Sequence, residues 1–226
     1  MRDELTSYSA ADGIALLRLE REGARNAINT QMLEEMLGHL AAAKEDEAVR
    51  VLVISSNDHL GLSAGADVRE ELDEPGRVRR MQLFADLYDE LTAYPKPTVA
   101  ACHGSVVGGG NLRLRFPGAA LGVPVGPARL VTLCGLSTAK YLLLTSRNVS
   151  ADEALRMGLI HRVAPAARTE EIAMELAGEV AAHPPESVAR IKKMLLDWDG
   201  VVERSAEEGR GQVAWQRTGP GLPHRD

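Results

Sequence analysis

Two stretches rich in glycine and small residues have the chemistry of backbone hydrogen-bond donors. The first is residues 63–67, Ser-Ala-Gly-Ala-Asp, and the second, further along the chain, is residues 103–110, His-Gly-Ser-Val-Val-Gly-Gly-Gly. Small side chains let the backbone approach a ligand closely, and N–H groups from two such turns can bind one oxygen together. The pair therefore predicts a site that stabilises negative charge on an oxygen, an oxyanion hole.

Each stretch alone also has a simpler interpretation. Residues 64–67 could form a tight turn that opens a helix, with Asp67 as its N-cap, and Gly108 to Gly110 could only allow close packing of a helix on a strand. The glycine run continues into Asn111 and the apolar residue Leu112.

Composition describes an ordinary globular chain and excludes some classes of function. The 226 residues are 45% hydrophobic and 26% charged, which suits one medium domain with a small appended element. A net charge of -6 argues against a general nucleic-acid binder. No signal peptide and no apolar run long enough for a bilayer is evident, so the prediction is a cytoplasmic protein without a membrane or nucleic-acid partner. The two cysteines, Cys102 and Cys134, are expected to be reduced, with a disulfide as the alternative.

Hydrophobic patterns predict the elements that position the two turns. They indicate strands over 14–19, 51–54 and 98–102, and helices over 29–44 and 78–94. Strands that alternate with helices predict a mainly parallel sheet with crossover helices. The strand over 51–54 leads through a polar loop into the first turn, and the strand over 98–102 leads into the second.

The C-terminal third reads as helical. Helices are predicted over 136–144, 151–157, 169–182 and 186–198, with abbreviated helical structure after Trp198 and a loosely ordered tail over 218–226. We therefore expect residues 1–135 to form the α/β core with the site, and residues 136–226 to form a helical region.

The motifs together are far more specific than either turn. In the order of its motifs, the chain resembles the enoyl-CoA hydratase/isomerase (crotonase) superfamily. That order is a strand, Ala64-Gly65-Ala66-Asp67, a helix, and then K-P-T-V-A-A-x-x-G-x-x-x-G-G-G from Lys96. Arg25-Asn26-Ala27 resembles the R-N-A segment of that family. Residues 142–145 and 151–160 resemble its L-T-G…A-x-x-A-x-x-x-G-L-V signature. The resemblance covers about residues 10–200.

The resemblance implies an α/β fold with a crotonase-like ββα spiral core and a C-terminal helical trimerisation region, shortened in the middle. It implies an acyl-coenzyme A thioester as the ligand, with coenzyme A as part of the substrate and no separate cofactor or metal. Self-association as a homotrimer or a dimer of trimers is also implied.

The resemblance further implies which residues form the site. The thioester carbonyl would accept hydrogen bonds from the N–H groups of Ala66 and Gly109. A second set of residues would bind the rest of the ligand: Gly108, the backbone around Leu62, Ala64 and Asp67 along the adenine and pantetheine path, and Arg25 at a coenzyme A phosphate.

The chain departs from the family where proton transfer takes place. Hydratases of this family position water with two glutamates, but Leu112 and Val125 occupy those positions here. Neither residue can transfer a proton, so two-glutamate hydration is not available. The chain also looks shortened after residues 110 and 125. These departures leave two hypotheses: an acyl-CoA enzyme, or a non-catalytic acyl-CoA-binding homologue or assembly subunit.

Other groups could in principle move a proton, although a structural role is favoured for each. His103 precedes the glycine run, Asp67 ends the first turn, and Tyr88 could present its hydroxyl to the acyl pocket. The acidic stretch over 70–73 is expected on a solvated face.

Overall fold

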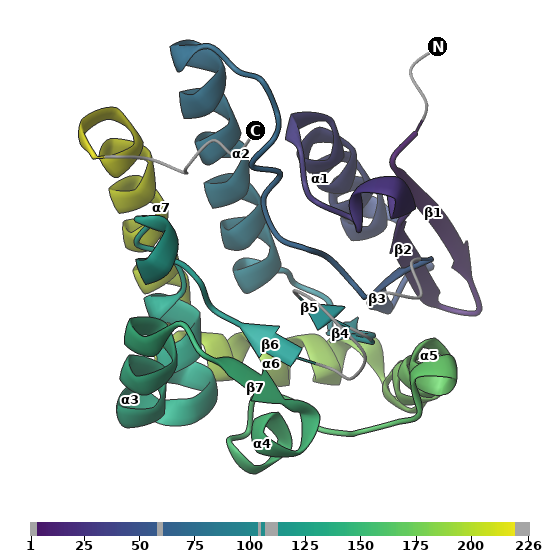
Figure 1. Ribbon diagram of the computed structural model, residues 1–226. Coiled ribbons are helices and arrows are strands. Elements are labelled where there is room, and N and C mark those ends of the chain that lie inside the picture. The colour runs from purple at the N-terminus through teal and green to yellow at the C-terminus, as the bar shows by residue number, and fades with distance from the viewer. Residues whose placement is uncertain (1–3, 58–60, 104, 107–112, 220–226) are drawn as a thin grey trace.

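The computed structural model describes residues 4–57, 61–103, 105–106 and 113–219. Its main sheet has the strand order β1 (Thr6–Ala11), β2 (Ile14–Leu19), β3 (Val51–Ser56) and β4 (Thr98–Ala100) (Figure 1). β1 and β2 pair antiparallel, whereas the β2–β3 and β3–β4 pairs are parallel. The prediction of a mainly parallel sheet with crossover helices is therefore confirmed.

The side chains of β2 point alternately to the two faces of this sheet, and each face is covered by a different helix. Ala15, Leu17 and Leu19 pack into one apolar cluster with α1 (Thr30–Glu45). Ile14 and Leu16 belong to a second cluster with the alanines of α5 (Thr169–Ala181). Because successive side chains of a strand point to opposite faces, one six-residue strand contributes to both cores.

Helix α2 (Glu74–Ala93) lies beside α1 on one side and α7 (Val201–Thr218) on the other (Figure 1). It begins four residues before the predicted start at Val78. The side chain of Asp73 accepts a hydrogen bond from the Gly76 N–H at 2.8 Å, and Pro75 occupies the first turn. These are favourable N-terminal residues of a helix, and they fix the start ahead of the apolar stripe.

A second, three-stranded sheet has the order β5 (Ser105–Val106), β6 (Arg113–Arg115) and β7 (Asn148–Ser150). Helix α3 (Pro127–Thr145) and helix α4 (Ala151–Arg156) pack beside it around Leu142, Val149 and Ala154. α3 is longer than the predicted helix over 136–144 and is kinked at Gly135, whose φ is 74°. Among the described connections are three short 3-10 helices: η1 (Glu22–Ala24), η2 (Ala119–Leu121) and η3 (Ala166–Arg168).

The C-terminal region ends with α6 (Pro185–Asp199) and α7, joined at Gly200. After Trp198 only abbreviated helical structure without bounds was expected, yet α7 spans 18 residues. Its buried positions are Val201, Ser205, Gly209 and Gln212, which include only one large apolar side chain. A helix that buries small and polar residues has no apolar period, so the length of this one was underestimated.

The expected α/β core with a helical C-terminal region is confirmed, whereas the division at residue 135 stays a prediction. None of the helices in the described part of the chain has both the length and the hydrophobicity needed to cross a lipid bilayer.

Candidate active site

The backbone around Ala66 is fixed by a single bridge to residue 28. The Ile28 N–H donates to the Gly65 carbonyl at 2.8 Å, and the Asp67 N–H donates to the Ile28 carbonyl at 2.9 Å. In a parallel bridge of this kind, the residue between the two bonded neighbours turns its own N–H to the other side. The Ala66 N–H therefore faces away from Ile28, and within the described residues it has no hydrogen-bond partner.

The residues before Ala66 have their amides occupied. The Ala64 N–H donates to the Arg25 carbonyl at 3.0 Å, and the Gly65 N–H donates to the Ser63 hydroxyl at 3.0 Å. Gly65 has a φ of +84°, and a Cβ added there would meet no atom within 4 Å, so glycine is required for conformation and not for space. The turn thus presents one N–H selectively, that of Ala66.

Asp67 is a structural anchor of this turn. Its carboxylate accepts hydrogen bonds from the Arg21 guanidinium at 2.6 Å and from the Arg69 N–H at 3.0 Å. Burial alone would raise its pKa, but these hydrogen bonds and the charges of Arg21 and Arg80 lower the pKa below its ordinary value. Asp67 is therefore ionised and fully engaged, and it caps no helix, because α2 begins only at Glu74.

A buried arginine holds the same turn from α2. Arg80 is 6% exposed, and its Nη1 donates to the Asp67 carbonyl at 2.8 Å and to the Glu70 carboxylate at 3.1 Å. Glu70 in turn accepts from the Thr30 N–H at the start of α1. The expectation of a solvated face is therefore wrong for Glu70, which bridges α1 and α2.

The other predicted ligand-binding residues in this region lie close to the turn. Arg25 has an exposed side chain and a left-handed φ of 52°. Its carbonyl receives the Ala64 N–H, which brings the backbones of residues 25 and 64 together. Leu62 is half-buried and packs against the α1 cluster. Arg25, Leu62, Ala64, Ala66 and Asp67 are thus gathered in one neighbourhood.

The second predicted turn falls outside the described residues, and this includes Gly108, Gly109 and Leu112. The strand that leads to it ends beside Cys102 and His103. Burial raises the pKa of the Cys102 thiol to about 11, which keeps it protonated and unreactive at neutral pH. His103 Nε2 lies 3.4 Å from the Ser56 hydroxyl at the end of β3, so the carboxyl ends of two neighbouring strands meet here.

The region around Val125 contains a carboxylate that sequence reasoning missed. Glu208 of α7 accepts from the Gly126 and Ala128 N–H groups, each at 2.7 Å, and from the Arg129 guanidinium and the Gln212 side chain. It therefore caps the N-terminus of α3, which has no capping side chain of its own. With four donors, this carboxylate is a structural cap next to the apolar Val125.

Tyr88 lies within the same polar cluster. The Arg129 guanidinium stands 4.5 Å from the centre of the Tyr88 ring, a cation–π arrangement. Burial raises the pKa of the Tyr88 hydroxyl, and the Arg129 charge only partly opposes that shift. The phenol is therefore neutral at pH 7 and can donate a proton in a hydrogen bond.

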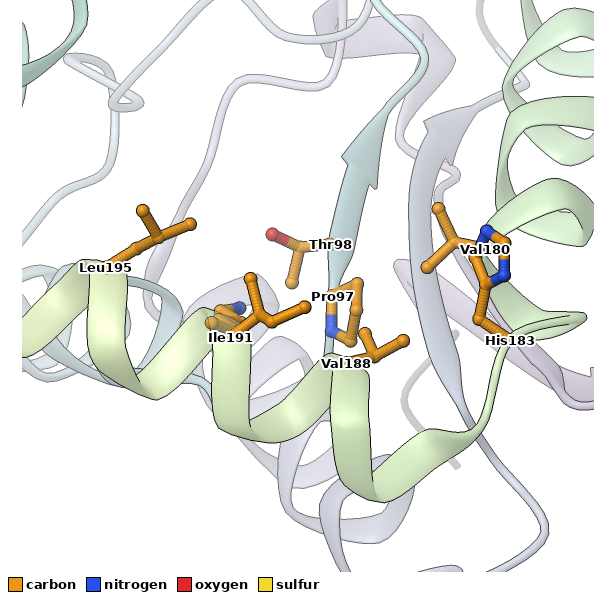
Figure 2. Close-up of a pocket in the computed structure, with 8 residues that line it drawn as sticks. Pro97, Thr98, Val180, His183, Val188, Ile191 and Leu195 are labelled. Carbon is orange, nitrogen blue, oxygen red and sulfur yellow. The ribbon is translucent and has the colours of Figure 1, made fainter.

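An open groove lies at the opposite end of β4 from the glycine motif. It has a volume of about 460 Å³ and separates the start of β4 from α6 and the end of α5 (Figure 2). Val188, Ile191 and Leu195 of α6 point toward Pro97 and Thr98. None of the predicted site residues lines it. In the part of the chain that the structure describes, no group of three or more histidine, cysteine or acidic side chains is arranged to hold a metal ion.

A spiral α/β core with small-residue turns at the carboxyl ends of its strands defines the crotonase class of proteins. The sequence matches models of the enoyl-CoA hydratase/isomerase family over residues 14–112 and 119–204. The chain therefore belongs to this family, and the resemblance inferred from its motifs is confirmed. The break between the matches falls next to the stretch that looked shortened.

Individual proteins support the same assignment. The chain is 31% identical to 2,3-dehydroadipyl-CoA hydratase of Escherichia coli, over 80% of this chain and 78% of the relative. It is 32% identical to a putative enoyl-CoA hydratase of Thermus thermophilus, over 83% of this chain and 82% of that relative. The solved structure of a probable enoyl-CoA hydratase from Mycobacterium thermoresistibile superimposes with a TM-score of 0.80 at 25% identity, covering 96% of this chain and 99% of that one.

Proposed function

We propose that this protein is an acyl-CoA enzyme that stabilises a thioester enolate, with the N–H groups of Ala66 and Gly109 as the oxyanion hole. The observation that supports this most directly is the Ala66 N–H, which faces away from residue 28 and is left without a partner in the described part of the chain. An amide held in this way needs no reorganisation to receive an oxyanion. Preorganised donors of this type typically contribute about 3–4 kcal/mol each to transition-state stabilisation.

The rest of the ligand is assigned to the neighbouring backbone. We propose that Leu62, Ala64, Asp67 and Gly108 line the adenine and pantetheine path, and that Arg25 binds a coenzyme A phosphate. Arg25 is exposed, and its backbone carbonyl accepts a hydrogen bond from the Ala64 N–H, which supports this placement. The reaction belongs to the hydratase or isomerase class, and its proton-transfer group is unassigned.

The alternative function is an acyl-CoA-binding protein without turnover, or an assembly subunit. Val125 is half-buried, and the nearby Glu208 carboxylate is occupied by four hydrogen-bond donors. Together with Leu112 in the sequence, this leaves no carboxylate at either family position for water activation.

The two functions are separated by turnover and binding measured on the same preparation. Crotonyl-CoA and longer enoyl-CoAs are incubated with the protein, and loss of the conjugated thioester absorbance reports turnover. Coenzyme A and acyl-CoA binding are measured by calorimetry. Turnover supports the enzyme, binding alone supports the alternative, and absence of both contradicts the acyl-CoA site.

The donor assignment is tested by removing single N–H groups. Replacing Ala66 by L-lactic acid turns its amide into an ester without adding atoms, and should reduce thioester turnover or binding about 100-fold or more. The same replacement at Ala182 is the control, since that N–H donates to the Gly178 carbonyl at the end of α5, outside the proposed site. Gly109→Pro should have the same effect as the change at Ala66. Unchanged activity in the folded Ala66 ester would rule out this hole.

We also propose that the chain self-associates as a homotrimer or a dimer of trimers. Leu133, Leu136, Tyr141 and Leu144 are exposed along α3. Exposed apolar side chains gathered on one element are typical of protein–protein interfaces.

A further inference from the structure

A lysine without a carboxylate partner among the described residues lines the groove between β4 and α6. Lys192 lines this groove together with apolar side chains, among them Val180, Ile191 and Leu195. Its Nζ donates to the Lys96 carbonyl at 2.6 Å and, within the described residues, has no carboxylate partner. Of the described side chains that line the groove, His183 is the other titratable one.

The neighbouring lysine has the opposite environment. The Lys193 side chain is 74% exposed, and its Nζ lies 2.7 Å from the Asp197 carboxylate. Burial without a compensating charge lowers the pKa of Lys192 to about 8. About a tenth of such amines are neutral at pH 7, against roughly one in 2,500 for an ordinary lysine.

We propose that Lys192 is a self-acylation site, at which the groove holds the acyl chain of a thioester and the Lys192 amine accepts the acyl group. The neutral Nζ attacks the thioester carbonyl carbon, a C–N bond forms, and the C–S bond breaks. Coenzyme A leaves as its thiolate, and the proton lost from nitrogen passes to solvent or to that thiolate. The products are an N-acyl-lysine and free coenzyme A.

The local contacts favour this product. An amide nitrogen keeps one N–H, so it can still donate to the Lys96 carbonyl. Acylation also removes a partly buried positive charge that nothing in the described groove neutralises, and burial of such a charge is unfavourable. The apolar lining of the groove covers part of the bound acyl chain, and each additional buried methylene of that acyl chain strengthens binding.

The test uses the full-length protein with octanoyl-CoA and acetyl-CoA at pH 8. Cleavage after Glu186 and Glu203 gives one peptide, residues 187–203, that contains both lysines, and fragment spectra distinguish acylation at Lys192 from that at Lys193. We expect about ten-fold or more octanoylation at Lys192 relative to Lys193, because burial lowers the pKa of Lys192 and the groove holds the acyl chain beside it, and a higher rate with octanoyl-CoA than with acetyl-CoA. The rate at Lys192 should rise with pH and level off above about pH 8.

Four controls distinguish selection by the groove from general lysine reactivity. Leu195→Ser should reduce the preference for octanoyl over acetyl while leaving the amine in place, and unfolding the protein should abolish the preference for Lys192. The octanoyl thioester of N-acetylcysteamine should give the same preference, since the groove and not a coenzyme A site selects the lysine.

Equal labelling of the two lysines in the folded protein, or no dependence of the rate on acyl-chain length, would overturn the proposal. Lys192→Arg should lose the modification and keep any enoyl-CoA turnover, so failure here is distinct from failure of the proposed oxyanion hole.

Discussion

At the scale of single residues, the Ala66 amide is positioned by charged side chains that hydrogen-bond to the neighbouring residue 67 and not to Ala66 itself. Arg21 and Arg80 both reach residue 67, one at its carboxylate and the other at its carbonyl. Ile28 holds the residues on either side of Ala66. A short turn without a regular hydrogen-bond ladder is thereby held in one conformation.

Asp67→Asn tests this anchoring through the pH dependence of stability. The variant removes a charged partner of Arg21, so its free energy of unfolding should be lower than that of the wild type by about 1–3 kcal/mol at pH 7. The pKa of Asp67 is lower in the folded than in the unfolded protein. Its ionisation therefore contributes stability above the unfolded value of about 3.9, and this contribution is lost as pH falls through the folded pKa.

The measurement is urea unfolding followed by circular dichroism at pH 7 and near pH 2. The difference between wild type and Asp67→Asn should be present at pH 7 and close to zero at the acidic end. Asp86→Asn, an exposed change on α2, serves as the control and should have little effect at either pH. A difference that persists unchanged in acid would mean that the charge of Asp67 is not what stabilises the turn.

At the scale of elements, α7 substitutes for capping residues that α3 lacks. Glu208 receives the first free N–H groups of α3, and Ser205 of the same helix joins Arg129 to Asp89 of α2. The two helices α2 and α3 are therefore connected through one face of α7.

Glu208→Ala should lower the free energy of unfolding by about 1–3 kcal/mol, because it leaves the Gly126 and Ala128 N–H groups and the Arg129 guanidinium without their acceptor. Glu208→Gln should recover part of this loss, since its amide oxygen can still accept. Chemical denaturation of the three proteins is compared with that of Glu207→Ala, an exposed neighbour. A loss at Glu207 equal to that at Glu208 would contradict the capping role.

Apolar periodicity explains which elements could be predicted from sequence. β2 was predicted with its observed bounds, and α1 differs by one residue at each end, because their apolar residues follow the period of a strand or a helix. The length of α7 was underestimated because its buried positions are mostly small or polar. The contacts of Glu70, Arg80 and Glu208 join segments that are distant in the sequence. Apolar periodicity within one sequence gives no information about such pairings.

The candidate site was predictable only in its backbone motif. Ala64 to Asp67 were identified from residue type and spacing, and the bridge to Ile28 supplies the direction of the Ala66 amide. That direction depends on pairing between segments far apart in sequence, which the motif does not encode. Gly108 and Gly109 stay predictions.

At the scale of the whole molecule, the two largest groups of exposed apolar side chains in the described part of the chain lie on two separate helices. One set lies along α3, where Leu144 is 75% exposed, and the other lies on α6, where Trp198 is 74% exposed. Large apolar side chains at this exposure favour association with another surface. The proposed self-association is assigned to the α3 set, since the α6 side chains next to Trp198 border the open groove.

Leu144→Asp should therefore dissociate the assembly, and Trp198→Asp should not. Placing an unpaired carboxylate in an apolar interface costs several kcal/mol, so the association constant should fall at least about ten-fold. Sedimentation velocity over a range of concentrations measures the mass, which for a trimer is three times the 24.3 kDa of one chain. Circular dichroism confirms that each variant is folded. A monomeric wild type would contradict self-association itself, and dissociation by Trp198→Asp alone would place the interface on α6, next to the groove of Lys192.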